Sequence, residues 1–447
     1  QAAASRIADQ ARVAGNATAG DGGGILVEGS ALTIEGSAAV TGNSGRNGGG
    51  VAVTGSGASL TLGGSAAISG NTASAAGGGA WSAPGRAEVD STLTASNVSG
   101  NTAATCAGYF HAQTGQCLVG GGGTGALTWT AQTPFGSQGT NDDQFEGPYG
   151  ITLANGGLEM YVADYTAKKI KIWTRASASA AWQAQTPLTA PYAPWNVALS
   201  DNGLELFEDD SYGFNTSPSN PRGRVRTWTR ASTSSAWQQQ TPIGSAPGDG
   251  NDGFKTPDGM AMTGDGLELY VADSYGHRVS VWTRTSTAAT WQAQTPLGNG
   301  SGSANNQIAS PRGLALAPGG LELFVVDRSN SRVSVWTRAN ASAAWQWSVL
   351  IGNGEGAGND QFNKPRGIAL SSDGLKMFVG DTSNNRVARW SRASAAAAWE
   401  ALTPLGSGSG TASDQFNKPQ YLALSPDDTE LYVSDWLNYR IAVWKAS

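Results

Sequence analysis

Cysteine, histidine and charged residues are all scarce in this chain of 447 residues. It has 2 cysteines and 2 histidines, and Asp, Glu, Lys and Arg make up 14% of it, against roughly 25% in an average soluble protein. The formal net charge of −6 argues against a nucleic-acid-binding surface, because such surfaces are basic. No apolar run approaches the roughly 20 residues of a membrane-spanning helix, so no membrane span is predicted.

Sequence signatures of catalysis are missing as well. No G-x-S-x-G nucleophile motif is present, and His111 and His277 are too few for a histidine-based zinc site. We therefore predict that the chain is not an enzyme and that it needs no cofactor or metal ion. A calcium site built from oxygen ligands alone stays open as an alternative.

Glycine, in contrast, is abundant, with 62 residues, and within residues 1–120 it recurs with a regular period. Gly-Asn pairs return at Asn16, Asn43, Asn71 and Asn101, each preceded by a β-branched apolar residue and followed by a block of small residues. Short strands separated by Gly and Asn, which tolerate positive φ, are typical of the coils of a parallel β-helix. Residues 1–120 are therefore predicted to form a parallel β-helix.

The recurrent pattern V-x-G-N followed by G-G-G-[IVA] resembles the β-helix repeat of polymorphic outer-membrane proteins. The last coil departs from this pattern and carries Cys106 and Cys117. We interpret that coil as a terminal cap, which repeat arrays require, and predict a disulfide between the two cysteines. Two free, buried thiols are the alternative.

Tryptophan, with 16 residues, marks a second type of repeat in residues 121–447. Five units carry a pair of tryptophans: Trp173/Trp182, Trp228/Trp237, Trp282/Trp291, Trp336/Trp345 and Trp390/Trp399. A sixth unit carries Trp444, and the segment that matches its missing partner contains Trp129 and precedes the first unit. Four alternating strands per unit predict an all-β, six-bladed β-propeller. The strand around Trp129 is predicted to complete the last blade and close the ring, which removes an exposed sheet edge.

The units share the motif D-Q-F-N-x-P-x-G-I-A-L … L-x-x-F/Y-V-x-D-x-x-N-x-R-V, seen from Asp360 to Val387 and again from Asp414 to Ile441. This motif resembles the NHL repeat. In each unit an aspartate closes the second strand and a cation opens the third: Asp164/Lys169, Asp210/Arg224, Asp273/Arg278, Asp327/Arg332, Asp381/Arg386 and Asp435/Arg440. We interpret these as ion pairs that hold a loop shut rather than as a ligand ring. The tryptophan pairs are predicted to pack between blades rather than to stack on carbohydrate.

One position varies although its neighbours are regular. The residue after the proline that opens each unit is Tyr149, Trp195, Asp258, Arg312, Arg366 or Gln420. These six side chains are predicted to lie near the mouth of the central channel, where propellers commonly bind ligands. Such variation is typical of a binding site, and drift at an unconstrained surface is the alternative.

Five N-x-S/T sequons are candidate glycosylation sites: Asn16, Asn97, Asn215, Asn299 and Asn340. Asn215 and Asn299 are expected in exposed loops, which makes them the better candidates. Asn16 is expected at a β-helix corner, where its side chain could stack inward instead.

Two rigid, weakly charged β modules without catalytic residues predict a structural subunit of an extracellular filament or surface appendage. Its copies would assemble through homotypic contacts, because the β-helix begins without an evident cap. Units of the form R-V-S-V-W-T-R-x-x-x-x-x-x-W (Arg278 to Trp291) are similar to those of the mastigoneme proteins of flagellated algae, and this resemblance implies a glycosylated filament. The alternative is a cell-surface adhesin or binding module whose propeller mouth captures a glycan or protein. A calcium-dependent, lactonase-like hydrolase is the third hypothesis.

Overall fold

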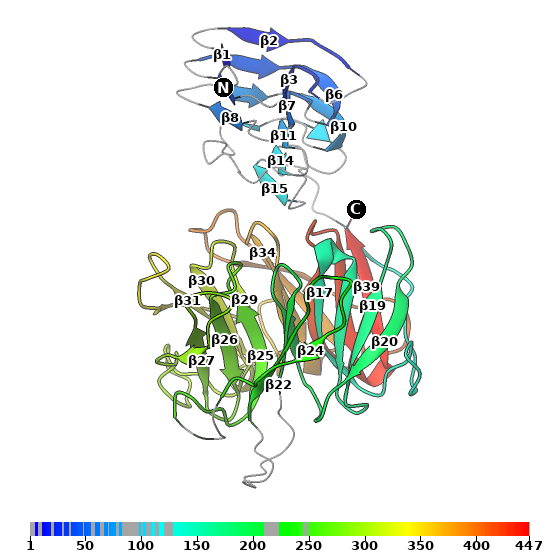
Figure 1. Ribbon diagram of the computed structural model, residues 1–447, viewed down its shortest axis with the longest axis vertical. Coiled ribbons are helices and arrows are strands. Elements are labelled where there is room, and N and C mark those ends of the chain that lie inside the picture. The colour runs from blue at the N-terminus through cyan, green and yellow to red at the C-terminus, as the bar shows by residue number, and fades with distance from the viewer. Residues whose placement is uncertain are drawn as a thin grey trace. The chain divides into compact units, whose positions relative to one another are not determined.

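The computed structural model of the protein describes residues 5–7, 11–18, 22–28, 31–34, 37–47, 49–54, 59–62, 67–69, 71–76, 80–82, 98–99, 102–103, 109–111, 116–119, 128–209, 223–244, 248 and 250–446. The chain divides into two compact units, Gln1–Leu127 and Thr128–Ser447, and each is built from β-strands (Figure 1). The predicted all-β class is confirmed. Within the described ranges, no helix has the length and apolar character needed to cross a membrane.

Short parallel strands make up the described part of the first unit. One sheet contains β1 (Ser5–Ile7), β4 (Ala31–Ile34) and β8 (Ser59–Leu62), and a second contains β2 (Arg12–Ala14), β5 (Ala39–Thr41), β9 (Ala67–Ser69) and β12 (Val98–Ser99). The third contains β6 (Ser44–Asn47), β10 (Thr72–Ala76) and β13 (Thr102–Ala103), and the fourth β3 (Ile25–Glu28), β7 (Val51–Thr54), β11 (Ala80–Ser82), β14 (Tyr109–His111) and β15 (Gln116–Val119). Only β14 and β15 are antiparallel among these described pairs.

The register of these sheets follows the sequence repeat. Val13 lies opposite Val40, and Val40 lies opposite Ile68, so the same repeat position recurs in neighbouring strands. Val40 and Ile68 are fully buried and share one apolar cluster with Ile34 and Val51. The period therefore sets both the pairing and the interior, while the winding of these sheets into one continuous β-helix stays a prediction.

The repeated asparagines form a ladder of hydrogen bonds. The Nδ2 of Asn16 donates to Oδ1 of Asn43 at 3.0 Å, and the Nδ2 of Asn43 donates to Oδ1 of Asn71 at 2.9 Å. An amide side chain both donates and accepts, so identical residues can continue such a ladder from one repeat to the next. The Nδ2 atom of Asn16, to which a glycan would be attached, is therefore hydrogen-bonded within the ladder.

Several sequence predictions lie outside the described residues. Asn97, Cys106, Asp210 and Asn215 are not described, and neither is the side chain of Cys117. The disulfide therefore stays a prediction.

Six four-stranded antiparallel sheets, numbered here as blades one to six, make up the described part of the second unit. Blades one to three are β17 (Pro148–Ala154), β18 (Glu159–Asp164), β19 (Lys169–Thr174) and β20 (Gln183–Thr189); β21 (Val197–Leu199), β22 (Glu205–Asp209), β23 (Val225–Thr229) and β24 (Gln238–Gln239); and β25 (Pro257–Met262), β26 (Glu268–Asp273), β27 (Arg278–Thr283) and β28 (Gln292–Ala293). Blades four to six are β29 (Pro311–Leu316), β30 (Glu322–Asp327), β31 (Arg332–Thr337) and β32 (Gln346–Ile351); β33 (Ile368–Leu370), β34 (Lys376–Asp381), β35 (Arg386–Ser391) and β36 (Glu400–Leu405); and β37 (Pro419–Leu424), β38 (Glu430–Asp435), β39 (Arg440–Ala446) and β16 (Trp129–Ala131). Short 3₁₀ turns lie at η1 (Asn155–Gly157), η2 (Arg328–Asn330), η3 (Thr382–Asn384) and η4 (Trp436–Asn438). The predicted six-bladed propeller is confirmed.

The fourth strand of blade six comes from the beginning of this unit. β16 pairs antiparallel with β39, with Ala131 opposite Trp444. The Trp129 ring centroid lies 5.2 Å from that of Phe378 in blade five. The segment around Trp129 thus supplies the strand that the repeat pattern assigned to it.

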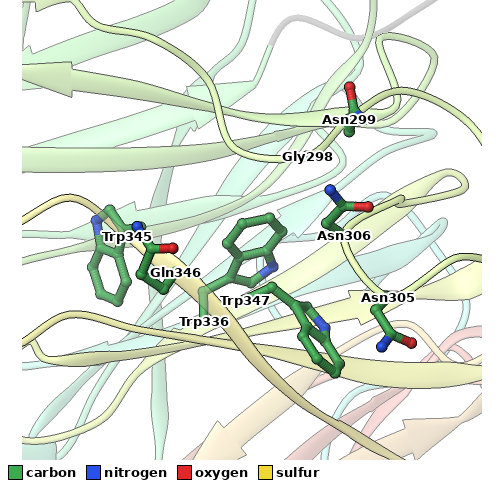
Figure 2. A pocket seen from close by; sticks show the side chains of 8 residues that line it. All are labelled: Gly298, Asn299, Asn305, Asn306, Trp336, Trp345, Gln346 and Trp347. Carbon is green, nitrogen blue, oxygen red and sulfur yellow. The ribbon is translucent and has the colours of Figure 1, made fainter.

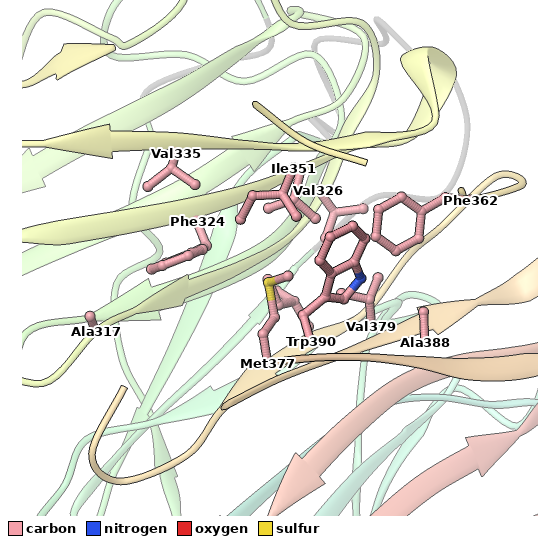
Figure 3. Packing of buried hydrophobic residues seen from close by; sticks show 12 residues of the cluster. Ala317, Phe324, Val326, Val335, Ile351, Phe362, Met377, Val379, Ala388 and Trp390 are labelled. Carbon is pink, nitrogen blue, oxygen red and sulfur yellow. The ribbon is translucent and has the colours of Figure 1, made fainter. Parts of the chain in front are cut away.

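Apolar side chains fill the spaces between neighbouring blades. Met377 and Trp390 of blade five lie in one buried cluster with Phe324 and Val326 of blade four (Figure 3). Phe362 stacks on Trp390 with ring centroids 5.8 Å apart. The same stacking recurs for Phe145 on Trp173, Phe254 on Trp282 and Phe416 on Trp444. Trp173, Trp282, Trp390 and Trp444 are therefore core residues.

The second tryptophan of each pair lies against an arginine that joins two blades. The guanidinium carbon of Arg338 is 4.6 Å from the Trp345 ring centroid, and its Nη2 is 2.7 Å from Oε2 of Glu268 in blade three. The arrangement recurs as Arg175–Trp182–Glu430, Arg230–Trp237–Glu159, Arg284–Trp291–Glu205 and Arg392–Trp399–Glu322. Cation–π attraction and a charge-assisted hydrogen bond act together at each seam. The predicted packing of these tryptophans between blades is confirmed.

The predicted pairs of aspartate and arginine hold loops shut in blades three to six. In blade four, Arg332 Nε is 2.8 Å from Asp327 Oδ2, and its two other nitrogens donate to carbonyl oxygens of the loop, at 2.8 Å to Ser303 and 3.0 Å to Ala304 and Gln307. Equivalent pairs are Arg278–Asp273, Arg386–Asp381 and Arg440–Asp435. The structural interpretation of these pairs is confirmed for these four blades.

Blade one uses a different cation from the one predicted. Lys171, which is fully buried, donates from Nζ to the carbonyl oxygen of Asn141 at 2.6 Å. Lys169 was predicted to hold this loop, yet the cation whose charge acts on the Asp164 carboxylate is Lys171. A lysine has one ammonium group, whereas arginine has a fork of several donors. Lys171 lies on the same face of β19 as Lys169, because side chains on a strand alternate with a period of two.

Candidate functional site

The first strands of the blades approach one another closely around the channel. The backbone nitrogen of Gly150 donates to the carbonyl oxygen of Trp195 at 2.9 Å, and that of Gly313 donates to Arg366 at 2.8 Å. A Cβ at Gly313 would lie 2.5 Å from the same carbonyl oxygen of Arg366, so only glycine fits here. This approach brings the variable residues that precede these glycines next to each other.

A cavity of about 280 Å³ lies among these first strands. Each blade contributes to its lining, with Ile151, Val197, Met260, Leu314, Ile368 and Tyr421 from blades one to six in turn. Most of the side chains that line it are apolar, and Tyr421 links it to a group of charged side chains.

Asp258 stands at the centre of that charged group. Arg312 Nη1 and the Tyr421 hydroxyl each donate to its carboxylate, and Asp258, Arg312 and Tyr421 are 0%, 5% and 5% exposed. Blades three and six are opposite in a ring of six, so the bond between Asp258 and Tyr421 crosses the channel. Burial raises the pKa of Tyr421, and the Asp258 carboxylate raises it further. Burial lowers the pKa of Arg312, but Asp258, Tyr421 and Tyr275 together outweigh burial, so the net direction is upward.

Arg366 lies against aromatic rings. Its guanidinium carbon is 5.2 Å from the Tyr149 ring centroid and 5.3 Å from that of Trp195. The Arg312 guanidinium carbon is 4.9 Å from the same Trp195 ring. Cation–π attraction of this kind replaces part of the hydration that a buried guanidinium loses.

Gln420 completes the predicted set. Its Nε2 donates to the carbonyl oxygen of Lys418 at 2.8 Å, while its Oε1 is buried without a hydrogen-bond partner among the described residues. The structure therefore brings together Tyr149, Trp195, Asp258, Arg312 and Arg366 and places Gln420 on the same first-strand position. Their role in binding stays a prediction.

Three residues that the sequence analysis missed, Tyr165, Arg328 and Trp436, lie beside the six predicted ones. The Tyr149 ring centroid lies 5.6 Å from that of Tyr165 and 5.3 Å from that of Trp436. Arg328 belongs to the same group, since after burial the charges of Arg366 and Arg312 lower its pKa most. Tyr165, Arg328 and Trp436 each directly follow the aspartate that closes the second strand of a blade. Variation at that position, beside an aspartate that recurs, is the signal that could have found them.

Positive charge exceeds negative charge at this site. Burial lowers the pKa of Arg366, and Arg312 lowers it further. Burial, then Arg366, then Arg312 lower the pKa of Arg328 to about 10. Among the described residues, Asp258 is the carboxylate that offsets these charges, and it is already hydrogen-bonded to Arg312. The site thus holds three guanidinium groups, those of Arg312, Arg328 and Arg366, near one carboxylate. That carboxylate, Asp258, is ion-paired with Arg312.

Several buried donors at the site lack a hydrogen-bond acceptor within the described part of the chain. Nη1 of Arg366, Nε of Arg328 and Nε1 of Trp195 are buried without a hydrogen-bond acceptor among the described residues. Buried polar atoms in proteins are nearly always satisfied. Within the described part of the propeller, these three donors are exceptions to that rule.

Other candidate residues lie apart from this cluster. His277 accepts a hydrogen bond at Nδ1 from the backbone nitrogen of Ser310 at 3.2 Å, and His111 is on β14 of the first unit. Asn299 and Asn340 are exposed, as a glycosylation site requires. Across the described ranges, no group of three or more His, Cys, Asp or Glu side chains is placed to hold a metal ion.

Comparison with known proteins supports the propeller assignment. The NHL-repeat family model matches residues 254–282, and no curated protein matches the chain. Among solved structures, an auxiliary nutrient binding protein from Bacteroides thetaiotaomicron is 11% identical with a TM-score of 0.52, covering 72% of this chain and 77% of that one. A protein from Bacteroides uniformis, described as a candidate 6-phosphogluconolactonase, is 14% identical with a TM-score of 0.50, covering 71% and 92%. The periplasmic gluconolactonase of Pseudomonas aeruginosa is 15% identical with a TM-score of 0.45, covering 66% and 80%.

The prediction that this chain is not an enzyme is corrected by these comparisons. It rested on the scarcity of histidine and on the absence of a nucleophile motif, yet a protein of the same fold is described as a candidate lactonase. The physical reason is that a propeller channel assembles its polar groups from separate blades, as Asp258, Arg312 and Tyr421 show. A linear motif search does not detect such a group.

Proposed function

We propose that the propeller binds an anionic small molecule, one with a carboxylate or phosphate group, at this channel mouth. The observation that carries the proposal is the pair Arg366 and Arg328, whose guanidinium groups are partly buried, close to each other and without a carboxylate partner among the described residues. An anion between them would restore the electrostatic balance and accept the free hydrogen bonds. This proposal corresponds to the binding-module alternative.

The aromatic side chains support a ligand with a ring or carbon skeleton beside its anionic group. Tyr149, Tyr165, Trp195 and Trp436 lie within 5.3–5.9 Å of one another, centroid to centroid, in successive pairs. Flat aromatic faces next to convergent polar groups are typical of small-molecule sites. A phosphorylated or oxidised sugar has both features.

Calorimetric titration with 6-phosphogluconate, gluconate and inorganic phosphate tests the proposal. The variant Arg366→Met removes one guanidinium and keeps an unbranched side chain of similar length. We expect it to weaken binding at least about tenfold, since a charge-assisted hydrogen bond to a buried ligand contributes roughly 1.5–3 kcal/mol.

Lys364→Met is the matched control. Lys364 lies two residues before Arg366, also carries one positive charge, and its side chain is 37% exposed in a surface pair with Glu355 at 3.9 Å. Its loss should leave the affinity unchanged. Equal weakening by both variants, or no binding of any of the three probes, would contradict the proposal.

Hydrolysis of an anionic sugar lactone at the same site is the second candidate function. The hydrogen-bonded Asp258 and Tyr421 lie beside the arginines that would hold the anionic group, and the similar fold described as a candidate 6-phosphogluconolactonase concerns such a substrate. Water would add to the lactone carbonyl, the ring ester bond would break, and the ring oxygen would leave as a hydroxyl. Acid release from 6-phosphogluconolactone in a pH-stat tests this function, and a rate equal to that without protein excludes it.

Three further predictions complete the proposed account. The sheets of the first unit form one parallel β-helix, which the Asn16–Asn43–Asn71 ladder supports, because its steps of 27 and 28 residues are nearly equal. β16 closes the propeller ring, which is supported by its pairing with β39 and by the ion pair of 2.6 Å between Arg175 of blade one and Glu430 of blade six. Assembly of an extracellular filament stays a prediction that rests on the sequence.

A further inference from the structure

A second pocket lies on the outer strands of blade four. Its volume is about 470 Å³, within the roughly 300–1,000 Å³ that is usual for small-molecule sites. Trp336, Trp347, Asn299, Asn305, Asn306 and Gln346 line it (Figure 2). It shares no lining residue with the channel cavity.

The pocket contains a tryptophan that the repeat does not require. Trp347 lies opposite Trp336 across β31 and β32, and four other units have alanine at its position: Ala131, Ala184, Ala293 and Ala401. Four other blades fold with alanine at this position, so the blade does not need the indole of Trp347 for its packing. Its Nε1 is without a hydrogen-bond acceptor among the described residues.

A second departure from the repeat removes a negative charge from the same pocket. Asn306 occupies the position of Asp143, Asp252, Asp360 and Asp414 in four other units. The loop itself is unchanged, because Asn299 N donates to the Asn306 carbonyl oxygen at 2.8 Å as Ser407 N does to Asp414. The amide of Asn306 therefore presents neutral donors and acceptors on a loop that elsewhere carries a carboxylate.

The remaining wall is held in place. Trp345 Nε1 donates to the Tyr270 hydroxyl at 3.1 Å, and its ring packs under Arg338. Trp336 is only 6% exposed and is fixed in the interior of the blade. In Figure 2 the side chains of Asn299 and Asn306 lie near each other on one side of the pocket, and that of Asn305 lies nearer Trp347.

We propose that this pocket binds the ring of a neutral saccharide. One face of a pyranose presents C–H groups, which pack on an indole, and its rim presents hydroxyl groups, which pair with amides that both donate and accept. The absence of charged side chains from the lining disfavours an ion, whose desolvation would have no compensation. This site is independent of the anion site in the channel.

The saccharide can come from two sources. Asn299 begins a sequon, Asn299-Gly300-Ser301, and is exposed at the rim, so a glycan attached there could lie in the pocket. A glycan of another molecule could also enter it. Ser301→Ala separates these sources because it removes the sequon and leaves every pocket side chain in place.

The test uses saturation-transfer NMR and calorimetric titration with methyl glycosides of glucose, galactose, mannose, xylose and N-acetylglucosamine. Wild-type protein should bind at least one of them. Trp347→Ala and Asn306→Asp should each weaken that binding at least about tenfold, which corresponds to 1.4 kcal/mol. Both variants restore the residue of the other units, so we expect them to fold, and circular dichroism checks this.

Blade five supplies a gain-of-function control. It has Asp360, Glu400 and Ala401 where blade four has Asn306, Gln346 and Trp347. The triple variant Asp360→Asn, Glu400→Gln, Ala401→Trp should add a second binding site of similar affinity. Binding by Ser301→Ala but not by the wild type identifies the attached glycan as the occupant. No binding of any glycoside by either protein, or undiminished binding by Trp347→Ala, overturns the proposal.

Discussion

In blades three to six, a single guanidinium holds the loop that leads into the blade. Arg332 uses its three nitrogens on Asp327 and on three backbone carbonyl oxygens. Burial raises the pKa of Asp327 even though Asn330, Ala309 and Arg332 all act to lower it. The pair therefore contributes its specific geometry more than a large net Coulomb energy.

Replacing Arg332 with alanine should be strongly destabilising. The change leaves the fully buried Asp327 carboxylate without its charged partner and removes the arginine donor from three carbonyl oxygens, and breaking a buried pair typically costs about 3–5 kcal/mol. Chemical denaturation followed by circular dichroism measures it. Lys364→Ala, which removes an exposed pair, is the control and should cost less than about 1 kcal/mol. A similar effect of both variants would contradict this account of the loop.

At the scale of elements, the seam between blades five and six differs from the other five. Each of the other five seams has a glutamate on one blade and an arginine on the next. At the seam between blades five and six, Lys376 stands in place of the glutamate and Ala446 in place of the arginine. Instead, the Asp428 carboxylate of blade six accepts hydrogen bonds from Ser372 of blade five, at 2.9 Å from the backbone nitrogen and 2.7 Å from Oγ. Burial raises the pKa of Asp428 to about 6, although the hydrogen bonds from Ser372 act to lower this pKa. The nearby Asp373 carboxylate adds to the upward shift.

This shift predicts a pH-dependent seam. The folded pKa of Asp428 lies above the unfolded value of roughly 3.9, so its contribution to stability is complete below the unfolded value and is lost as the pH rises through about 6. An asparagine amide at this position would not titrate. The free energy of unfolding of Asp428→Asn, relative to wild type, should therefore increase by about 2 kcal/mol between pH 4.5 and 7.5. A constant difference across that range would contradict the assigned shift.

The sequence predicts the elements well because their period is strict. In blades three to six the aspartate and the arginine of each pair are five residues apart, so the local sequence pattern was sufficient to predict the pairing of Asp327 with Arg332. The seam pairs could not be predicted, because Arg338 and Glu268 are 70 residues apart and no local motif joins them. The bond between Tyr421 and Asp258 spans 163 residues and depends on the ring itself. The channel residues were predictable by position, while their mutual contacts were not.

At the scale of the whole molecule, β16 joins the beginning of the propeller to its end. Deleting residues 128–134 should expose the outer edge of β39 and remove Trp129, which is 9% exposed, from its contact with Phe378. We expect lower thermal stability and aggregation, since an unpaired edge is a template for another chain. Size-exclusion chromatography with light scattering measures the mass of the monomer and of any aggregate, and thermal denaturation measures the stability. Thr130→Ala, at an exposed position of the same strand, is the control and should remain as stable as wild type; a monomeric deletion variant of equal stability would refute ring closure.

A crystal structure of the protein grown with 6-phosphogluconate at saturating concentration would show whether the channel mouth binds an anion. We expect density for the ligand against Arg366 and Arg328, with its phosphate or carboxylate within hydrogen-bonding distance of at least one guanidinium. We also expect the ion pair between Arg312 and Asp258 to persist. Density for water alone at the channel mouth, or ligand bound only elsewhere on the protein, would contradict the proposed anion site.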